Sequence, residues 1–203
     1  MEQRYYLYLT RESWVGAWVN GGEIPINPAS AYLSDVREGT RTPDEAYQQT
    51  SSGVPDWVLS DSDGPCPIKV MPGAGSIMLK NVSIDWGPGK VAHVAQGIAS
   101  SRFEDGLILS LALSLDSQLA KKLGKEACVQ IRCMACLIET LDQQIGTKCK
   151  WGKVRYRDGF ARNHFLKSKA DEWQQEYRLL WLTPDVSPRT VVLPPNMATR
   201  VVW

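Results

Sequence analysis

The alternation of apolar and polar positions divides the chain into short strands and a few helices. The aromatic run at 5–9 is typical of a strand, and tryptophans and valines then recur at helical spacing over 11–20 until Gly21. Thr10 stands where a helix cap is expected. This region predicts a strand, a short helix and a glycine turn.

The middle of the chain has a different pattern. Residues 23–57 are rich in Pro, Ser, Thr and Gly without periodicity, which predicts an ordered loop with at most one short helix. Three proline or glycine clusters then separate short apolar runs over 54–95, as is typical of strands joined by turns.

Strand and helix signals alternate in the second half. Residues 107–115 predict a strand that runs into a helix ending at Gly124, and 127–146 predict a further strand or core helix. Residues 175–182 predict a strand closed by Pro184. The whole pattern predicts an α+β fold with a mixed, mainly antiparallel sheet and few helices.

The length of 203 residues predicts a single domain over 1–203, or one domain with an elaborate insertion. The 23 basic and 22 acidic residues nearly balance, so the net charge recruits neither nucleic acid nor an anionic membrane. No apolar run approaches the roughly 20 residues of a membrane helix, and the charged, aromatic start is unlike a signal peptide. We therefore expect a soluble, cytoplasmic protein without a membrane partner.

Five cysteines make an odd number, without the even framework of a secreted disulfide scaffold. Cys133 and Cys136 form a C-x-x-C pair. A four-thiolate zinc site would need Cys128 and Cys149 as its other two ligands. A second C-x-x-C is missing. We expect reduced thiols, with Cys66 among them, and no bound metal.

Four stretches in order carry a resemblance: "YLYLT" with the helix and Asn-Gly turn after it, "IPINPASAYLS", "VRYRDG" and "FLKSKADEWQQEYRLLW". Together they resemble a poorly characterised family of bacterial and phage proteins with a late Lys, Trp, Glu, Arg signature. The layout is similar to that of the ADP-ribosyltransferase superfamily, although only Ser110 and Ser114 stand in for its Ser-Thr-Ser strand. The resemblance implies an ADP-ribosyltransferase-like fold, NAD as substrate, and a role in phage–host conflict or antiviral defence.

The resemblance implies catalytic roles for Gln174 and Glu176, which look like the pair in which a glutamate orients the nicotinamide ribose and stabilises its positive transition state. On a strand, positions i and i+2 share one face, so Arg178 lies on the same side and either binds phosphate or neutralises the glutamate. The alternative is a solvated surface network of Glu172, Glu176 and Arg178.

Four residues are candidates for holding the dinucleotide. Tyr8 and Arg11 lie at the end of the first strand, where the resemblance places a dinucleotide-gripping side chain, with Arg4 as the fallback. Arg178 is the third candidate. His164 is the fourth, either as a base or as a residue that orients the ligand, and ordinary packing of His164 is the alternative.

The most basic stretch, 153–169, includes Arg155, Arg157 and Lys167 among aromatic residues. It predicts either a pyrophosphate site or a track for a nucleic-acid backbone, and a solvated strand face is the alternative.

Two functional hypotheses follow. The first is an NAD-dependent ADP-ribosyltransferase or NAD glycohydrolase that passes ADP-ribose to a protein, a nucleic acid or water. The second is a non-enzymatic module of a phage or defence system that binds a protein or nucleic acid, for which eight tryptophans supply anchors.

Overall fold

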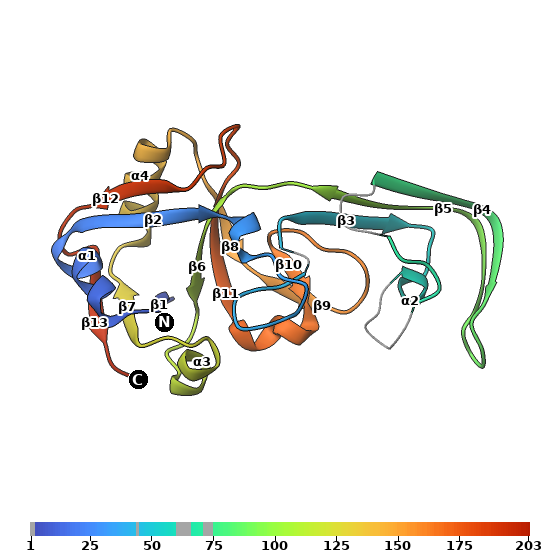
Figure 1. Cartoon of the computed structure of the whole chain (residues 1–203), viewed down its shortest axis with the longest axis horizontal. Coiled ribbons are helices and arrows are strands. Elements are labelled where there is room, and N and C mark those ends of the chain that lie inside the picture. Colours follow the sequence, from blue (N-terminus) through green and yellow to red (C-terminus); the bar gives the residue numbers. More distant parts are fainter. Residues whose placement is uncertain (1–2, 44, 60–65, 71–74) are drawn as a thin grey trace. The chain divides into compact units, whose positions relative to one another are not determined.

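The described residues of the computed structural model, 3–43, 45–59, 66–70 and 75–203, form two compact units. Unit 1 lies within Met1–Pro43, Asp105–Val154 and Trp173–Trp203, and unit 2 lies within Asp44–Glu104 and Arg155–Glu172. The chain thus leaves unit 1 twice to build unit 2 (Figure 1). That the two units act as one domain stays a prediction.

Unit 1 is built on an eight-stranded sheet with the order β12-β2-β6-β1-β7-β13, in which β11 pairs with both β6 and β8 (Figure 1). Its strands are β1 Tyr6–Leu9, β2 Gly22–Pro28, β6 Leu107–Ala112, β7 Ala127–Ile131, β8 Lys150–Lys153, β11 Glu176–Trp181, β12 Arg189–Leu193 and β13 Ala198–Val201. These pairs are antiparallel. The expected α+β fold with mainly antiparallel sheets is confirmed. The likeness to ADP-ribosyltransferases in fold stays a prediction.

The helices of unit 1 are short. They are η1 Glu12–Trp14, α1 Val15–Asn20, η2 Ala29–Tyr32, α3 Ser117–Lys122 and α4 Met134–Ile145, and η3 Lys169–Gln174 spans the boundary between the units. Trp18 of α1 and Leu137 and Leu141 of α4 are buried in the main core. Because these side chains recur on one face of each helix, α1 and α4 contribute to the same core as the sheet.

The two faces of the sheet differ in chemistry. Leu179 and Trp181 of β11 join the main core, as do Leu109 of β6 and Val129 of β7. The alternate positions face the other way, where Tyr6, Tyr8, Ala112 and Cys128 form a smaller cluster with Leu119 and Ala120 of α3. This second face also carries the polar positions of β11, because successive strand residues point to opposite sides.

Unit 2 contains two small sheets. Its elements are β3 Tyr47–Ser52, α2 Asp56–Leu59, β4 Gly75–Asp85, β5 Val91–Phe103, β9 Arg155–Arg157 and β10 Leu166–Ser168. Strands β3, β5 and β4 form an antiparallel sheet in that order, and β9 pairs with β10 in parallel. A core that includes Val58, Val94, Ala99 and Phe160 lies within this unit.

Two local predictions are wrong. The segment 23–57 contains β2 and β3 rather than only loop and short helix, because backbone pairing with β12 and β5 makes strands of sequences rich in Pro, Ser and Thr. Thr10 does not cap the first helix. Arg11 holds the N-cap position without a side-chain hydrogen bond, and the hydroxyl of Thr10 accepts one from Lys125 Nζ at 2.9 Å.

The expected strands at 5–9, 107–115 and 175–182 correspond to β1, β6 and β11. The core segment 127–146 is both a strand and a helix, β7 and α4. Of the apolar runs after residue 54, those over 75–84 and 91–95 lie in β4 and β5, and the run 68–71 extends beyond the described residues. No helix in the described part of the chain is long and apolar enough to cross a membrane.

Candidate functional site

Glu176 and Arg178 form a buried ion pair on the second face of the unit 1 sheet. Arg178 Nε donates to Glu176 Oε2 at 2.6 Å, and the two side chains are 4% and 11% exposed for Arg178 and Glu176 respectively. The pair follows from strand alternation, since Glu176 lies opposite Ala112 and Arg178 opposite Ser110 in β6. Its burial does not fit the alternative of a solvated surface network.

Gln174 does not extend this strand face. It ends η3, and Gln175 has a positive φ of 46°, so the backbone changes direction before β11 begins. The amide of Gln174 donates from Nε2 to the backbone oxygen of Gly39 at 2.8 Å. The expectation that Gln174 and Glu176 share a face through strand alternation is therefore wrong, because Gln174 lies outside the strand.

The hydroxyl of Tyr8 is hydrogen-bonded to the backbone within unit 1. Its hydroxyl donates to the backbone oxygen of Ser114 at 3.0 Å and accepts from the backbone N–H of Asp116 at 2.7 Å. Burial raises the pKa of Tyr8 to about 12, so the phenol is neutral at physiological pH. These bonds position the turn before α3, and the predicted contact of Tyr8 with a dinucleotide has no support from this geometry.

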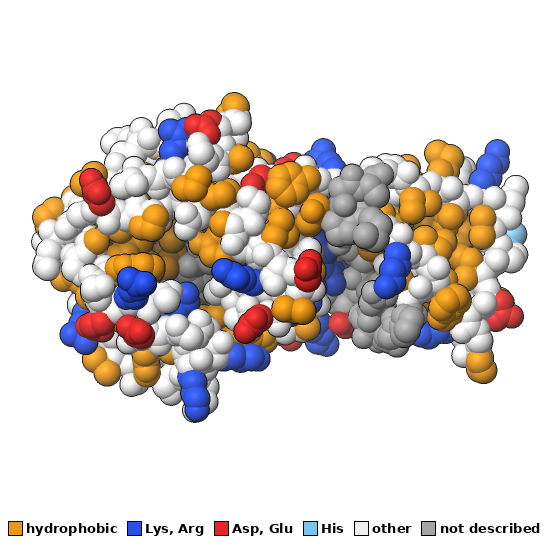
Figure 2. All heavy atoms as spheres, viewed as in Figure 1, with side chains coloured by type: hydrophobic (Ala, Val, Ile, Leu, Met, Phe, Trp, Pro, Cys, Tyr) orange, Lys and Arg blue, Asp and Glu red, His pale blue; other side chains and the backbone are white. Residues whose placement is uncertain are grey.

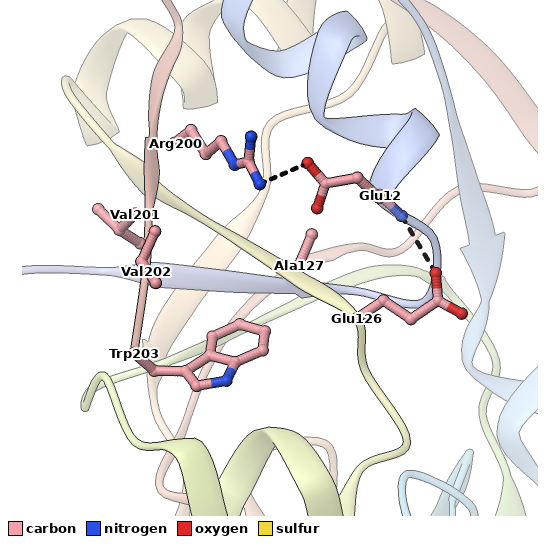
Figure 3. A pocket seen from close by; sticks show the side chains of 7 residues that line it. All are labelled: Glu12, Glu126, Ala127, Arg200, Val201, Val202 and Trp203. Atoms are coloured by element: carbon pink, nitrogen blue, oxygen red, sulfur yellow. Dashed lines mark hydrogen bonds and ion pairs between the residues drawn. The ribbon is translucent and has the colours of Figure 1, made fainter.

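Arg11 is exposed, and its neighbour Glu12 lines a small pocket of about 170 Å³. Figure 3 shows the Arg200 guanidinium turned toward Glu12, at 2.8 Å, while the Glu126 carboxylate accepts from the Glu12 backbone N–H at 3.4 Å. The indole of Trp203 closes the other side of this pocket. Two carboxylates against one guanidinium make the pocket unsuitable for an anionic dinucleotide.

A larger pocket of about 930 Å³ lies at the start of β1 and the end of β7. Among the described residues that line it, both charged side chains are arginines, Arg4 and Arg132. Tyr5 and Tyr6 add aromatic rings, and the first turn of α4 forms part of its lining. Two guanidiniums beside aromatic rings suit a ligand that combines phosphate with a planar ring.

This pocket borders the strand that carries Glu176. Ala112 pairs with Glu176 on one side and with the pocket residue Tyr6 on the other. The pocket residue Leu113 donates its backbone N–H to Gln175 O at 3.0 Å. Two strand spacings separate Glu176 from Tyr6, about 10 Å between Cα atoms.

His164 and the basic stretch belong to unit 2. His164 is buried, with Nε2 3.9 Å from Glu104 Oε1. Lys167 is also buried and lies 3.7 Å from Glu45, whereas Arg157 is exposed and pairs with Asp56 at 3.5 Å. The basic residues are thus divided between a buried ion pair and an exposed strand, and they do not form one uniform face.

The cysteines are not all reduced. Cys133 and Cys136 form a disulfide, while Cys128 and Cys149 are free thiols. The thiol of Cys66 donates to the backbone oxygen of Ile68 at 3.4 Å. The expectation of reduced thiols is therefore wrong for this pair, because the first turn of α4 brings the two sulfurs together. The described residues contain no group of three or more His, Cys, Asp or Glu side chains arranged to hold a metal ion.

Comparison of the chain with known protein families, with curated proteins and with solved structures finds no match.

Sequence reasoning missed Arg132 and the tyrosines of the larger pocket. The sequence signal for Arg132 was its position directly after a buried strand and directly before the helix with the C-x-x-C pair. Residues that connect a strand to a helix lie at the surface and are often functional. Arg4, the fallback choice, lines this pocket, and the preferred Arg11 is absent from the lining of both pockets described above.

Proposed function

We propose that the protein binds NAD and cleaves the bond between nicotinamide and ribose, as an ADP-ribosyltransferase or an NAD glycohydrolase. The observation that carries the proposal is the buried Glu176–Arg178 pair at the start of β11, one strand away from the larger pocket with its two arginines. ADP-ribose then passes to a macromolecular acceptor, a protein or a nucleic acid, or to water.

The larger pocket supports NAD as the ligand through its size and charge. A volume of about 930 Å³ lies at the upper end of the range for small-molecule sites, roughly 300–1,000 Å³. In the proposal, Arg4 and Arg132 bind the pyrophosphate, since a guanidinium meets two phosphate oxygens at once. Tyr5 and Tyr6 line the same pocket, although the ring of Tyr5 packs against Tyr177 and Tyr6 is 7% exposed.

Glu176 supplies the chemistry in this proposal. As the bond to nicotinamide breaks, positive charge develops on the ribose, and a fixed carboxylate in a water-poor site stabilises that charge. Arg178 is a positioning residue, because its 2.6 Å contact with Oε2 fixes the glutamate side chain. NAD cleavage to nicotinamide and an ADP-ribosyl cation then needs only a nucleophile, the acceptor or water, which loses its proton on attack.

The proposal leaves out four earlier candidates. Tyr8 is bonded to the turn before α3, Gln174 is bonded to Gly39, and Arg11 is replaced by Arg4. His164 lies in unit 2 and has no assigned step. A setting in phage–host conflict rests on the resemblance alone and stays a prediction.

The proposed NAD site is tested by titrating NAD into the wild type and the Arg4→Gln and Arg132→Gln variants. Each charge-assisted hydrogen bond to phosphate contributes roughly 1.5–3 kcal/mol, so each variant should bind NAD about 10- to 100-fold more weakly. Arg200→Gln is the matched control, because Arg200 lines the smaller pocket, and it should bind NAD as the wild type does. Equal affinity in all four proteins would exclude this pocket.

The second candidate is a non-enzymatic binding module, and the hairpin of β4 and β5 in unit 2 favours it. Met78 and Ile98 lie opposite each other there and are 67% and 42% exposed. Val91 and Trp86 near the turn are also exposed, and Figure 2 displays hydrophobic side chains over these strands. A separate titration of the wild type with an oligonucleotide at two salt concentrations tests this candidate, and tight, salt-sensitive binding without any NAD signal would favour it.

A further inference from the structure

The disulfide between Cys133 and Cys136 lies at the N-terminus of α4, a helix of twelve residues. Cys133 is the N-cap residue and also lines the larger pocket, while Cys136 is exposed. The bond is therefore accessible from solvent, unlike a disulfide buried in a core. It closes a loop of only two intervening residues, which constrains little of the unfolded chain.

The surroundings of Cys133 favour a negatively charged sulfur. Its Sγ accepts a hydrogen bond from the backbone N–H of Cys136 at 3.2 Å, and the positive end of the α4 dipole points at the same atom. Arg132 precedes it in the chain, and Arg4 lines the same pocket. Such positive surroundings stabilise a thiolate, and a stabilised thiolate is a good leaving group.

Two free cysteines of unit 1 have the opposite surroundings. Cys128 is fully buried, and burial raises its pKa to about 12. Burial, with a further contribution from the nearby Asp142, also raises the pKa of Cys149 to about 12. Both thiols are protonated at neutral pH, so they serve as internal controls for the reactivity of the Cys133–Cys136 pair.

We propose that Cys133 and Cys136 form a redox-active disulfide that exchanges with an external dithiol. A thiolate of the external dithiol attacks the exposed sulfur of Cys136, the protein S–S bond breaks, and Cys133 leaves as the thiolate. The second external thiolate then attacks the mixed disulfide and releases Cys136, which takes up a proton. Two electrons pass to the protein, the dithiol becomes a disulfide, and one net proton enters the solvent.

This inference is independent of the proposed NAD chemistry, because it rests on the covalent bond and on the helix that carries it. A purely structural disulfide would behave differently. It would stay closed in the folded protein and become reducible only on unfolding.

The first test treats the folded wild type with dithiothreitol, alkylates it with iodoacetamide and maps the labels by peptide mass spectrometry. The expected result is labelling at Cys133 and Cys136 but not at Cys128, with the disulfide re-forming when oxidised glutathione replaces dithiothreitol. If the pair is labelled only in urea, or does not re-form, the proposal is wrong.

The second test measures alkylation rates of the reduced, folded protein at pH 7. Cys133 should react at least about a hundredfold faster than Cys149, because the pKa of Cys149 is raised to about 12 and each unit of pKa changes the thiolate fraction about tenfold, an effect that lower nucleophilicity offsets only in part. Arg132→Gln should slow Cys133 several-fold, and Arg200→Gln should leave it unchanged. In Cys136→Ser, which cannot form the bond, Cys133 should stay fast. Equal rates for Cys133 and Cys149 in these proteins would overturn the proposal.

Discussion

Asp142 joins helix α4 to strand β11 through a buried hydrogen bond. Its Oδ1 accepts from Trp181 Nε1 at 2.7 Å and from the backbone N–H of Cys149 at 3.0 Å. Trp181 is completely buried and Asp142 is 6% exposed. Lys148 also contacts the carboxylate at 3.5 Å, but its side chain is 88% exposed.

Asp142→Ala removes the acceptor and leaves the buried indole N–H of Trp181 without it. A hydrogen bond to a charged group contributes roughly 1.5–3 kcal/mol, so the loss of two predicts destabilisation of about 3–6 kcal/mol. Asp142→Asn keeps an acceptor oxygen and should cost about 1–2 kcal/mol. Lys148→Gln removes an exposed ion pair and should cost under about 0.5 kcal/mol.

Urea unfolding followed by circular dichroism measures these differences as shifts in the midpoint at constant slope. A double-mutant cycle with Trp181→Phe isolates the indole contact, with an expected coupling of about 1.5–3 kcal/mol. The reasoning fails if Asp142→Ala is no less stable than Lys148→Gln, or if the coupling is near zero.

Two further predictions concern Tyr8 and the glycines of unit 2. Burial raises the pKa of Tyr8 from 10.0 to about 12, so the unfolded chain loses the phenol proton at a lower pH than the folded protein does. The contribution of Tyr8 to the free energy of unfolding is therefore complete below pH 10, and it falls by on the order of 2 kcal/mol between pH 10 and pH 12. Urea midpoints of Tyr8→Phe and the wild type should therefore converge over that range, and a constant difference would contradict this. Gly53 has a φ of 70°, and a methyl group added there would lie within 3.0 Å of the backbone oxygen of Gln96. Gly87 also has a positive φ, but a methyl group added there would meet no atom within 4 Å. Gly53→Ala should therefore lower the melting temperature far more than Gly87→Ala. Equal shifts would contradict the close approach.

The placement of Arg178 on the same side as Glu176 could be predicted, because strand alternation places residues i and i+2 on one face. Whether Arg178 binds phosphate or pairs with the glutamate was left open, and the structure has the pair. The same rule failed for Gln174, since the positive φ of Gln175 ends the alternation. A left-handed glutamine carries no local sequence signal comparable to that of glycine. Alternation is therefore reliable only where the strand itself continues.

Long-range partners could not be predicted. Tyr8 was assigned to a ligand because the resemblance places a dinucleotide-gripping side chain at the end of the first strand, whereas its hydrogen-bond partner Asp116 is more than 100 residues away. Strand β2 was missed because Pro25 and Pro28 suggest a loop, although pairing with β12 and β6 stabilises them in a strand. The spacing of Cys133 and Cys136 was visible in the sequence, but spacing alone does not distinguish a dithiol from a disulfide.

The most direct test of the central claim is the rate of nicotinamide release from NAD by the wild type and by Glu176→Gln. Glu172→Gln, the same substitution at an exposed position four residues earlier, is the matched control. We predict that Glu176→Gln lowers the rate by at least about a hundredfold while NAD still binds and the fold is kept, and that Glu172→Gln is unchanged. Equal rates for Glu176→Gln and the wild type, or no release by the wild type in water and with protein or nucleic-acid acceptors, would contradict the proposed function.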